Sequence, residues 1–140
     1  MSVQDNIGLA RRLTETWNAR DPDAYGALLS DNHTFESDTI PAPAVGRAAA
    51  QDLLRAYWEG SSDLHFDITG IFGDGDKVAV QWQSSGRHTG PFAGIPATGR
   101  HSSSRGCTVY TCADGKIAHS AVYWDSAHLL RDLGALPALT

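Results

Sequence analysis

Residues 114–134 read DGKIAHSAVYWDSAHLLRDLG, and the predicted fold depends most on this stretch. Asp114 and Gly115 predict a tight turn, because both residue types tolerate the positive φ angles of a hairpin. From Lys116 onwards, apolar and polar residues alternate as they do in a strand, and the leucines that follow are spaced as on one side of a helix. A single carboxylate, Asp125, lies where the strand pattern ends and the helix pattern begins.

The second half of the chain predicts four consecutive strands, over 63–72, 77–88, 100–112 and 116–125. Glycine and aspartate residues at 73–76 predict one tight hairpin, and those at 113–115 predict another. The longer segment GPFAGIPATG, at 90–99, predicts a wide connection. Neighbouring strands joined in this way form an antiparallel sheet.

The first half has the residue spacing of helices. Apolar residues recur every three to four positions from residue 2 to about 20, and Ser2 with Asp5 forms a capping pair at the start. Asp21 and Pro22 predict a short second helix, and a third is expected from about 46 to 59, with Gly60 as its end. A strand at 33–37 and the proline-rich loop TIPAPAVGR separate the last two. Helices followed by a sheet predict one α+β domain over 1–140, with the sheet curling over the helices.

Composition and charge limit the classes of function. A chain of 140 residues is expected to form one domain whose core needs no metal or disulfide. Eleven basic and sixteen acidic residues leave a net charge of −5 without a basic stripe, which argues against a nucleic-acid partner. No apolar run approaches about 18 residues and no signal-peptide pattern is present, so no membrane partner and a cytoplasmic location are expected. Cys107 and Cys112 lie on opposite faces of one predicted strand, so we expect free thiols; no zinc motif is readable, so no metal is expected.

Two segments resemble the SnoaL-like polyketide cyclase family, within the nuclear transport factor 2-like superfamily. They are GRHTGPFAGIPATGR at 86–100 and DGKIAHSAVYWDSAHLLRDLG at 114–134. The resemblance implies a cone-shaped fold, in which a curved antiparallel sheet wraps around helices and a pocket opens inside the curve. It also implies chemistry without a cofactor, pairing through the outer face of the sheet into a homodimer or homotetramer, and a small hydrophobic ligand of polycyclic or polyketide-like character.

In the cyclases of this family, the carboxylate after the last strand is the acid–base group that closes a ring by intramolecular aldol condensation. Its place in Y-x-D before L-L-x-x-L-G matches Asp125. The alternation of the last strand also puts Asp125 on one face with Ile117, His119 and Tyr123, and the apolar and aromatic members of that face predict that it lines the cone. Desolvation there favours the neutral acid, whereas the N-terminus of the next helix favours the anion. The alternative is that Asp125 only caps the helix at 126–133.

Three histidines are candidates for a catalytic or ligand-binding role beside Asp125. His119 could hold a substrate oxygen or shuttle protons, or it could be a packed or half-exposed residue. His88 lies in the G-x-H-T-G element, where it could line the pocket or belong to a turn. His101 is a weaker candidate for ligand contact. The remaining histidines are expected to face solvent or pack locally: His33, His65 and His128.

Aromatic side chains and one arginine complete the expected binding site. Trp17 and Phe35 would floor the cavity of a cone-shaped fold and touch a flat polycyclic ligand, although both residue types are also common in a core. Tyr123 could donate a hydrogen bond to a developing enolate oxygen. Arg105 would bind an anionic or carbonyl group if it faces inward, or lie at a subunit interface if it faces outward.

The expected function is therefore a cofactor-free ring closure, or a related isomerisation, on a hydrophobic polyketide-derived intermediate. Asp125 would remove a proton flanked by carbonyls and return it to the new alkoxide, while the pocket folds the substrate over itself. Two alternatives stay open. One is a non-catalytic small-molecule-binding module of the same fold, and the other is a hydrolase or dehydratase acting on another hydrophobic substrate.

Overall fold

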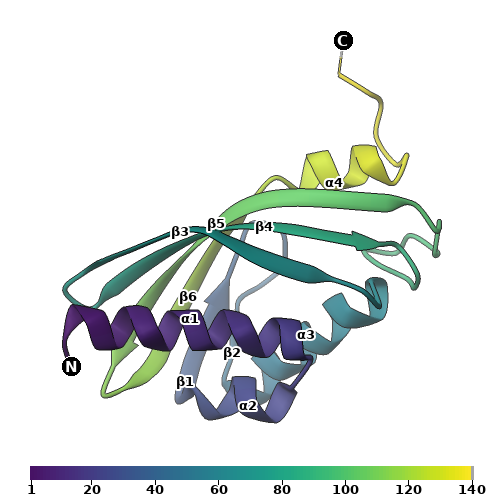
Figure 1. Cartoon of the computed structure of the whole chain (residues 1–140). Helices are drawn as coiled ribbons and strands as arrows, with labels where there is room; N and C mark the ends of the chain where they lie inside the picture. The colour runs from purple at the N-terminus through teal and green to yellow at the C-terminus, as the bar shows by residue number, and fades with distance from the viewer. Residues whose placement is uncertain (140) are drawn as a thin grey trace.

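The computed structural model describes residues 1–139 and has the α+β architecture that the sequence predicts. Figure 1 shows the sheet arching over α1, with α2 and α3 on the same side and α4 on the other. The helices are α1 (Val3–Ala19), α2 (Pro22–Ala27), α3 (Arg47–Gly60) and α4 (Ser126–Asp132). The strands are β1 (Leu29–Glu36), β2 (Ala44–Val45), β3 (His65–Asp74), β4 (Lys77–Arg87), β5 (His101–Ala113) and β6 (Lys116–Trp124). Within the described part of the chain, no helix is both long and apolar enough to cross a bilayer.

The six strands form one sheet in the order β2-β1-β6-β5-β4-β3. Strands β3 to β6 pair antiparallel, as predicted. β1 instead runs parallel to β6, so the sheet is mixed and not wholly antiparallel. Only strands joined by a short hairpin must run antiparallel, and β1 is separated from β6 by most of the chain. β2 lies inside the proline-rich loop and escaped prediction because it has only two residues.

Helix α1 has the capping box that its sequence predicts. The backbone N–H of Asp5 donates to Ser2 Oγ at 3.0 Å, and the backbone N–H of Ser2 donates to Asp5 Oδ2 at 3.1 Å. The apolar side of the helix buries Leu9, Ala10 and Leu13 against the sheet. Each leucine buried in this way contributes about 1.5–3 kcal/mol. Local signals and burial therefore favour the same helix.

Strand β5 alternates without interruption over its thirteen residues. Its even-numbered residues face the helices, and among them Ser104, Thr108 and Tyr110 are buried. Its odd-numbered residues face the convex side. Cys107 and Cys112 lie on opposite faces and are free thiols, as predicted.

A β-bulge in β6 decides which of its side chains face the helices. The pairing of β6 with β5 shifts between Ile117 and His119, so Ala118 has no partner. One extra residue in a strand reverses the facing of every residue after it. Ile117 is fully buried, but from Ser120 onwards the even-numbered residues of β6 are the ones that face inward.

Strand β1 has an irregularity at the same level of the sheet. Its pairing with β6 is interrupted between Leu29 and Thr34. The chain rejoins the sheet with His33 turned inward and fully buried. Of the two placements expected for His33, facing solvent or packed locally, the structure has the packed one. The alternation of a short strand could not distinguish them, because it gives no information about a neighbouring irregularity.

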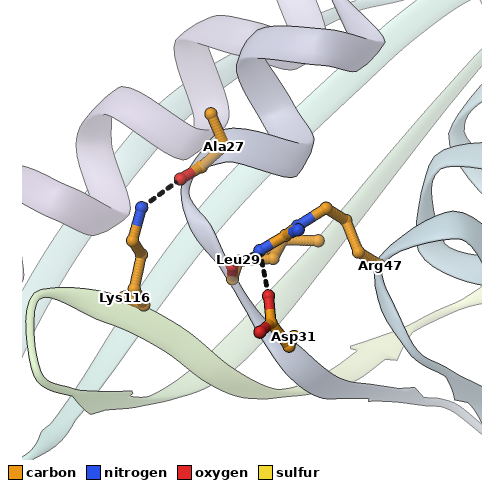
Figure 2. Close-up of polar contacts among 5 residues, drawn as sticks. All are labelled: Ala27, Leu29, Asp31, Arg47 and Lys116. Carbon is orange, nitrogen blue, oxygen red and sulfur yellow. Dashed lines mark hydrogen bonds and ion pairs between the residues drawn. The ribbon is translucent and has the colours of Figure 1, made fainter.

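Two basic side chains stabilise this interrupted region (Figure 2). Arg47 Nη2 donates to Leu29 O at 3.0 Å and to Asp31 Oδ1 at 2.7 Å. Lys116 Nζ donates to Ala27 O at 2.6 Å, which joins the start of β6 to the end of α2. Side chains thus supply hydrogen bonds where the ladder between the strands is interrupted.

Candidate active site

A cavity lies between the concave face of the sheet and the helices. The cavity has a volume of about 120 Å³, roughly ten times what one water needs. Its wall combines aromatic rings, a few aliphatic side chains and a row of hydroxyl groups. The rings belong to Trp17, Tyr25, Phe35, Tyr57, Phe66, Trp82, Phe92, Tyr110 and Trp124. Trp17 and Phe35 therefore lie where the cone-shaped fold was expected to place them, and their role in binding stays a prediction.

Edge-on contacts hold the aromatic rings of the wall in fixed orientations. The Trp17 ring packs edge-on against Tyr25 and Phe66, with centroids 6.0 and 5.2 Å apart. Phe66 packs in the same way against Trp82 at 5.2 Å. Trp82 Nε1 in turn donates to Thr108 Oγ1 at 3.0 Å. A preformed aromatic wall of this kind suits a flat, largely apolar guest.

A stripe of small polar residues crosses this wall along β4 and β5. Ser84 pairs with Ser104 across the two strands, and Gly86 pairs with Ser102. These serines line the cavity, as does His88, just beyond the end of β4. Inward residues of one strand are about 6.7 Å apart. The stripe therefore offers polar groups at regular intervals to the edge of an elongated ligand.

Carboxylates are missing from the wall. Within residues 1–139, no aspartate, glutamate, lysine or arginine side chain lines the cavity. Its ionisable groups are His88 and the phenols of Tyr25, Tyr57 and Tyr110. Burial raises the pKa of all three phenols, which stay neutral and can donate or accept hydrogen bonds but carry no charge. Nowhere within residues 1–139 are three or more His, Cys, Asp or Glu side chains grouped so that they could hold a metal ion.

The hydrogen bonds of His88 define which of its ring nitrogens carries the proton, and the side chain is only 3% exposed. The backbone N–H of Thr98 donates to His88 Nδ1 at 3.1 Å, and Thr98 Oγ1 lies 2.9 Å from the same nitrogen. Since an amide N–H can only donate, Nδ1 is the acceptor and the neutral ring carries its proton on Nε2. Nε2 is buried and has no hydrogen-bond partner within residues 1–139. His88 thus combines a place on the cavity wall with an N–H donor that no group within residues 1–139 uses.

The wide connection between β4 and β5 positions this ring. It folds back so that His88 N–H donates to Arg100 O and Gly99 N–H donates to His88 O, each at 2.8 Å. Gly90 lets the loop pack on the end of α3, because a Cβ there would lie 2.0 Å from Glu59 O. The backbone of His88 is thus held by two hydrogen bonds to residues 99 and 100.

Asp125 does not face the cavity, and the expectation that it does is wrong. It is exposed, and its Oδ1 accepts a hydrogen bond from the backbone N–H of His128 at 3.0 Å, as the N-cap of α4. The physical reason is the bulge at Ala118, which reverses the alternation before the chain reaches Asp125. Asp125 lies with Arg105 beside a polar groove that also contains Gln81, Gln83 and Cys107.

The same bulge turns His119 and Tyr123 to the convex face. Tyr123 is 61% exposed, and His119 Nε2 lies 3.5 Å from Glu36 Oε2. His101 and Arg105 are exposed on the odd-numbered, convex side of β5. The inward placement of His119, Tyr123 and His101 is therefore wrong, and Arg105 takes the outward alternative.

The structure also reveals a buried polar pair that the sequence did not indicate. His33 Nε2 lies 2.8 Å from Ser120 Oγ, and the two residues are 0% and 1% exposed. Ser120 lines the cavity. Burial, assisted by the nearby His119, lowers the pKa of His33 to about 4, so the ring is neutral near pH 7. No motif marks this pair, because its members come from strands that are far apart in the chain.

Known proteins share this architecture. The model of the SnoaL-like polyketide cyclase family matches residues 7–133. The aklanonic acid methyl ester cyclase DauD of Streptomyces sp. (strain C5) is 28% identical over 137 residues, which cover 94% of this chain and 83% of DauD. The cyclase DnrD of Streptomyces peucetius, described by the same activity, is 28% identical over 139 residues, 96% of this chain and 92% of DnrD. The crystal structure of AclR from Streptomyces galilaeus matches with a TM-score of 0.88 at 23% identity, over 99% of this chain and 91% of AclR.

Proposed function

The chain belongs to the SnoaL-like polyketide cyclase family, and on that basis we propose that it closes a ring in a flat polyketide-derived molecule by intramolecular aldol addition. The observation that carries the proposal is the Nε2–H of His88, a buried donor that has no partner within residues 1–139 and belongs to a wall of aromatic rings and hydroxyl groups. A polyketide-like ligand combines an apolar frame with carbonyl oxygens. It therefore offers the rings a surface to stack on and the donors oxygens to bind.

The addition needs little from the protein beyond binding and donors. A proton from a carbon between two carbonyls passes to water, and the enolate carbon bonds to another carbonyl carbon. The carbonyl π pair moves to its oxygen, which takes a proton back, so the product is an isomer of the substrate. A carbon flanked by two carbonyls is acidic enough for this to start without a carboxylate in the wall. His88 Nε2–H would donate to the oxygen on which charge develops, and the shaped cavity would hold the two carbons together.

A non-catalytic ligand-binding module is the second candidate. The observation that favours it is the same lack of carboxylates on the cavity wall within residues 1–139. A module of this kind predicts tight binding of flat compounds without any chemical change.

The test is an incubation with aklanonic acid methyl ester, the compound for which the relatives DauD and DnrD are named. We expect a product of unchanged mass and altered chromatographic retention, formed faster than in buffer alone. A product lighter by one water would indicate a dehydratase. Quenching of the cavity tryptophans without any product would overturn the proposal in favour of the binding module.

Removal of the Asp125 carboxylate separates its capping role from a chemical one. Asp125→Ala is expected to lower the free energy of unfolding by about 1 kcal/mol, because the cap of α4 is lost, and to leave kcat unchanged. Asp125→Asn is the matched variant, since asparagine also caps helices, and it should leave both quantities unchanged. Urea unfolding and steady-state kinetics check the two results. If both variants lost kcat while Asp125→Asn kept the stability of the wild type, the result would show that the Asp125 carboxylate takes part in catalysis.

A further inference from the structure

We propose that the hydroxyl of Ser120 is a second catalytic hydrogen-bond donor of the cavity, beside His88, and that His33 is its positioning residue. The inference rests on the proposed ring closure. It places a second donor on the wall formed by β6 and β1, whereas His88 lies beyond the end of β4. Neither residue was a candidate from the sequence.

The pair can reach a ligand only through the serine. Ser120 is part of the cavity wall, and its neighbour across the strands, Phe35, lines the same wall. The His33 ring is fully buried and its Nε2 lies 2.8 Å from Ser120 Oγ. His33 therefore acts on the contents of the cavity through the hydroxyl group that it holds.

The position of the shared proton follows from the other nitrogen of the ring. His33 Nδ1 is buried and has no hydrogen-bond partner in the described part of the chain. A buried N–H without an acceptor costs more than a buried lone pair without a donor, so the neutral ring carries its proton on Nε2. Nε2–H then donates to Ser120 Oγ. The Ser120 O–H makes no other hydrogen bond within residues 1–139 and can donate into the cavity.

Two separate donors match the movement of charge in the ring closure. Negative charge starts on the enolate oxygen and ends on the alkoxide oxygen. If His88 donates to the accepting carbonyl, Ser120 would donate to the enolate oxygen and so fix the second reacting part of the substrate. The hydrogen bond from His33 leaves Ser120 with its own proton directed away from the ring, which increases its strength as a donor.

Four variants test the pair through steady-state kinetics with aklanonic acid methyl ester. Ser120→Ala and His33→Leu are expected to lower kcat about 10- to 100-fold with a smaller change in KM, since the lost donor acts on developing charge. His33→Gln should recover most of kcat, because its amide nitrogen can occupy the place of imidazole Nε2. His65→Leu is the matched control on the exposed His65 and should behave as the wild type.

Stability distinguishes a functional pair from a structural one. Replacing both partners of a buried hydrogen bond by apolar groups is close to neutral or stabilising. The double variant His33→Leu with Ser120→Ala should therefore melt at the Tm of the wild type or above it, while kcat falls. A lower Tm that accompanies the loss of kcat would show that the pair only joins β1 to β6, and full kcat in Ser120→Ala would also overturn the inference.

A binding experiment keeps this inference separate from the reaction itself. The probe is 1,8-dihydroxyanthraquinone, a flat compound with carbonyl and phenol oxygens, followed by quenching of tryptophan fluorescence. Ser120→Ala should weaken its affinity about 5- to 10-fold, the size expected for one hydrogen bond. If the wild type converts no substrate but this loss is found, the ring closure fails while the role of Ser120 as an oxygen-binding group stands. Unchanged affinity removes Ser120 from ligand binding.

Discussion

Replacement of His88 by leucine is expected to lower kcat for ring closure by about 10²–10³-fold, the usual effect of removing one donor to a developing oxyanion. The side chain is buried, its Nδ1 accepts from the Thr98 amide, and its Nε2–H has no partner among the residues that the structure describes. The donor is thus already oriented before a ligand arrives. A group that is fixed in advance acts on the transition state without further ordering.

The matched variants of His88 separate the donor from the shape of the ring. His88→Gln keeps an N–H near the position of Nε2 and should retain part of the activity. Thr98→Val removes the hydroxyl beside Nδ1 but keeps the backbone N–H that sets the tautomer, so its effect should be small. Circular dichroism and Tm establish that each variant is folded. Turnover of His88→Leu within a few-fold of the wild type would remove His88 from the mechanism.

Lowering the pH from 7 to 4 is expected to remove about 3 kcal/mol of stability through His33 alone. Burial lowers its pKa from 6.5 to about 4 in the folded chain. Between these two values the unfolded chain binds a proton that the folded chain does not. The contribution of neutral His33 to the free energy of unfolding is therefore fully present above pH 6.5 and is lost as the pH decreases toward 4. Urea unfolding at intervals across this range measures the slope.

His33→Leu isolates the contribution of this residue. The leucine variant has no proton to bind at this position, so its stability should change much less between pH 7 and 4. Hydrogen bonds to the carboxylates lower the pKa of Asp5 and Asp63, and the stability that they contribute is lost only at still lower pH. Equal slopes for the wild type and His33→Leu would contradict the neutral, buried state of His33.

Much of the fold could be predicted because its signals are local. The capping pair Ser2 and Asp5, and the turn residues Asp114 and Gly115, act within a few residues of their own position. The helices, the hairpins and the resemblance to the family follow from such signals. The resemblance to the family led to the expectation that Trp17, Phe35 and His88 lie near the cavity, and all three line it, while their roles in binding or catalysis stay predictions.

The sequence by itself therefore determined the helices, the strands other than β2, the hairpin order of β3 to β6 and the family to which the chain belongs. Only the tertiary structure decided that Asp125 faces solvent and that Ser120 faces the cavity with His33 behind it. The physical reason is the bulge at Ala118, where pairing with β5 shifts by one residue. Such a shift arises from contacts between strands that are distant in the chain, and it reverses the facing of every side chain that follows.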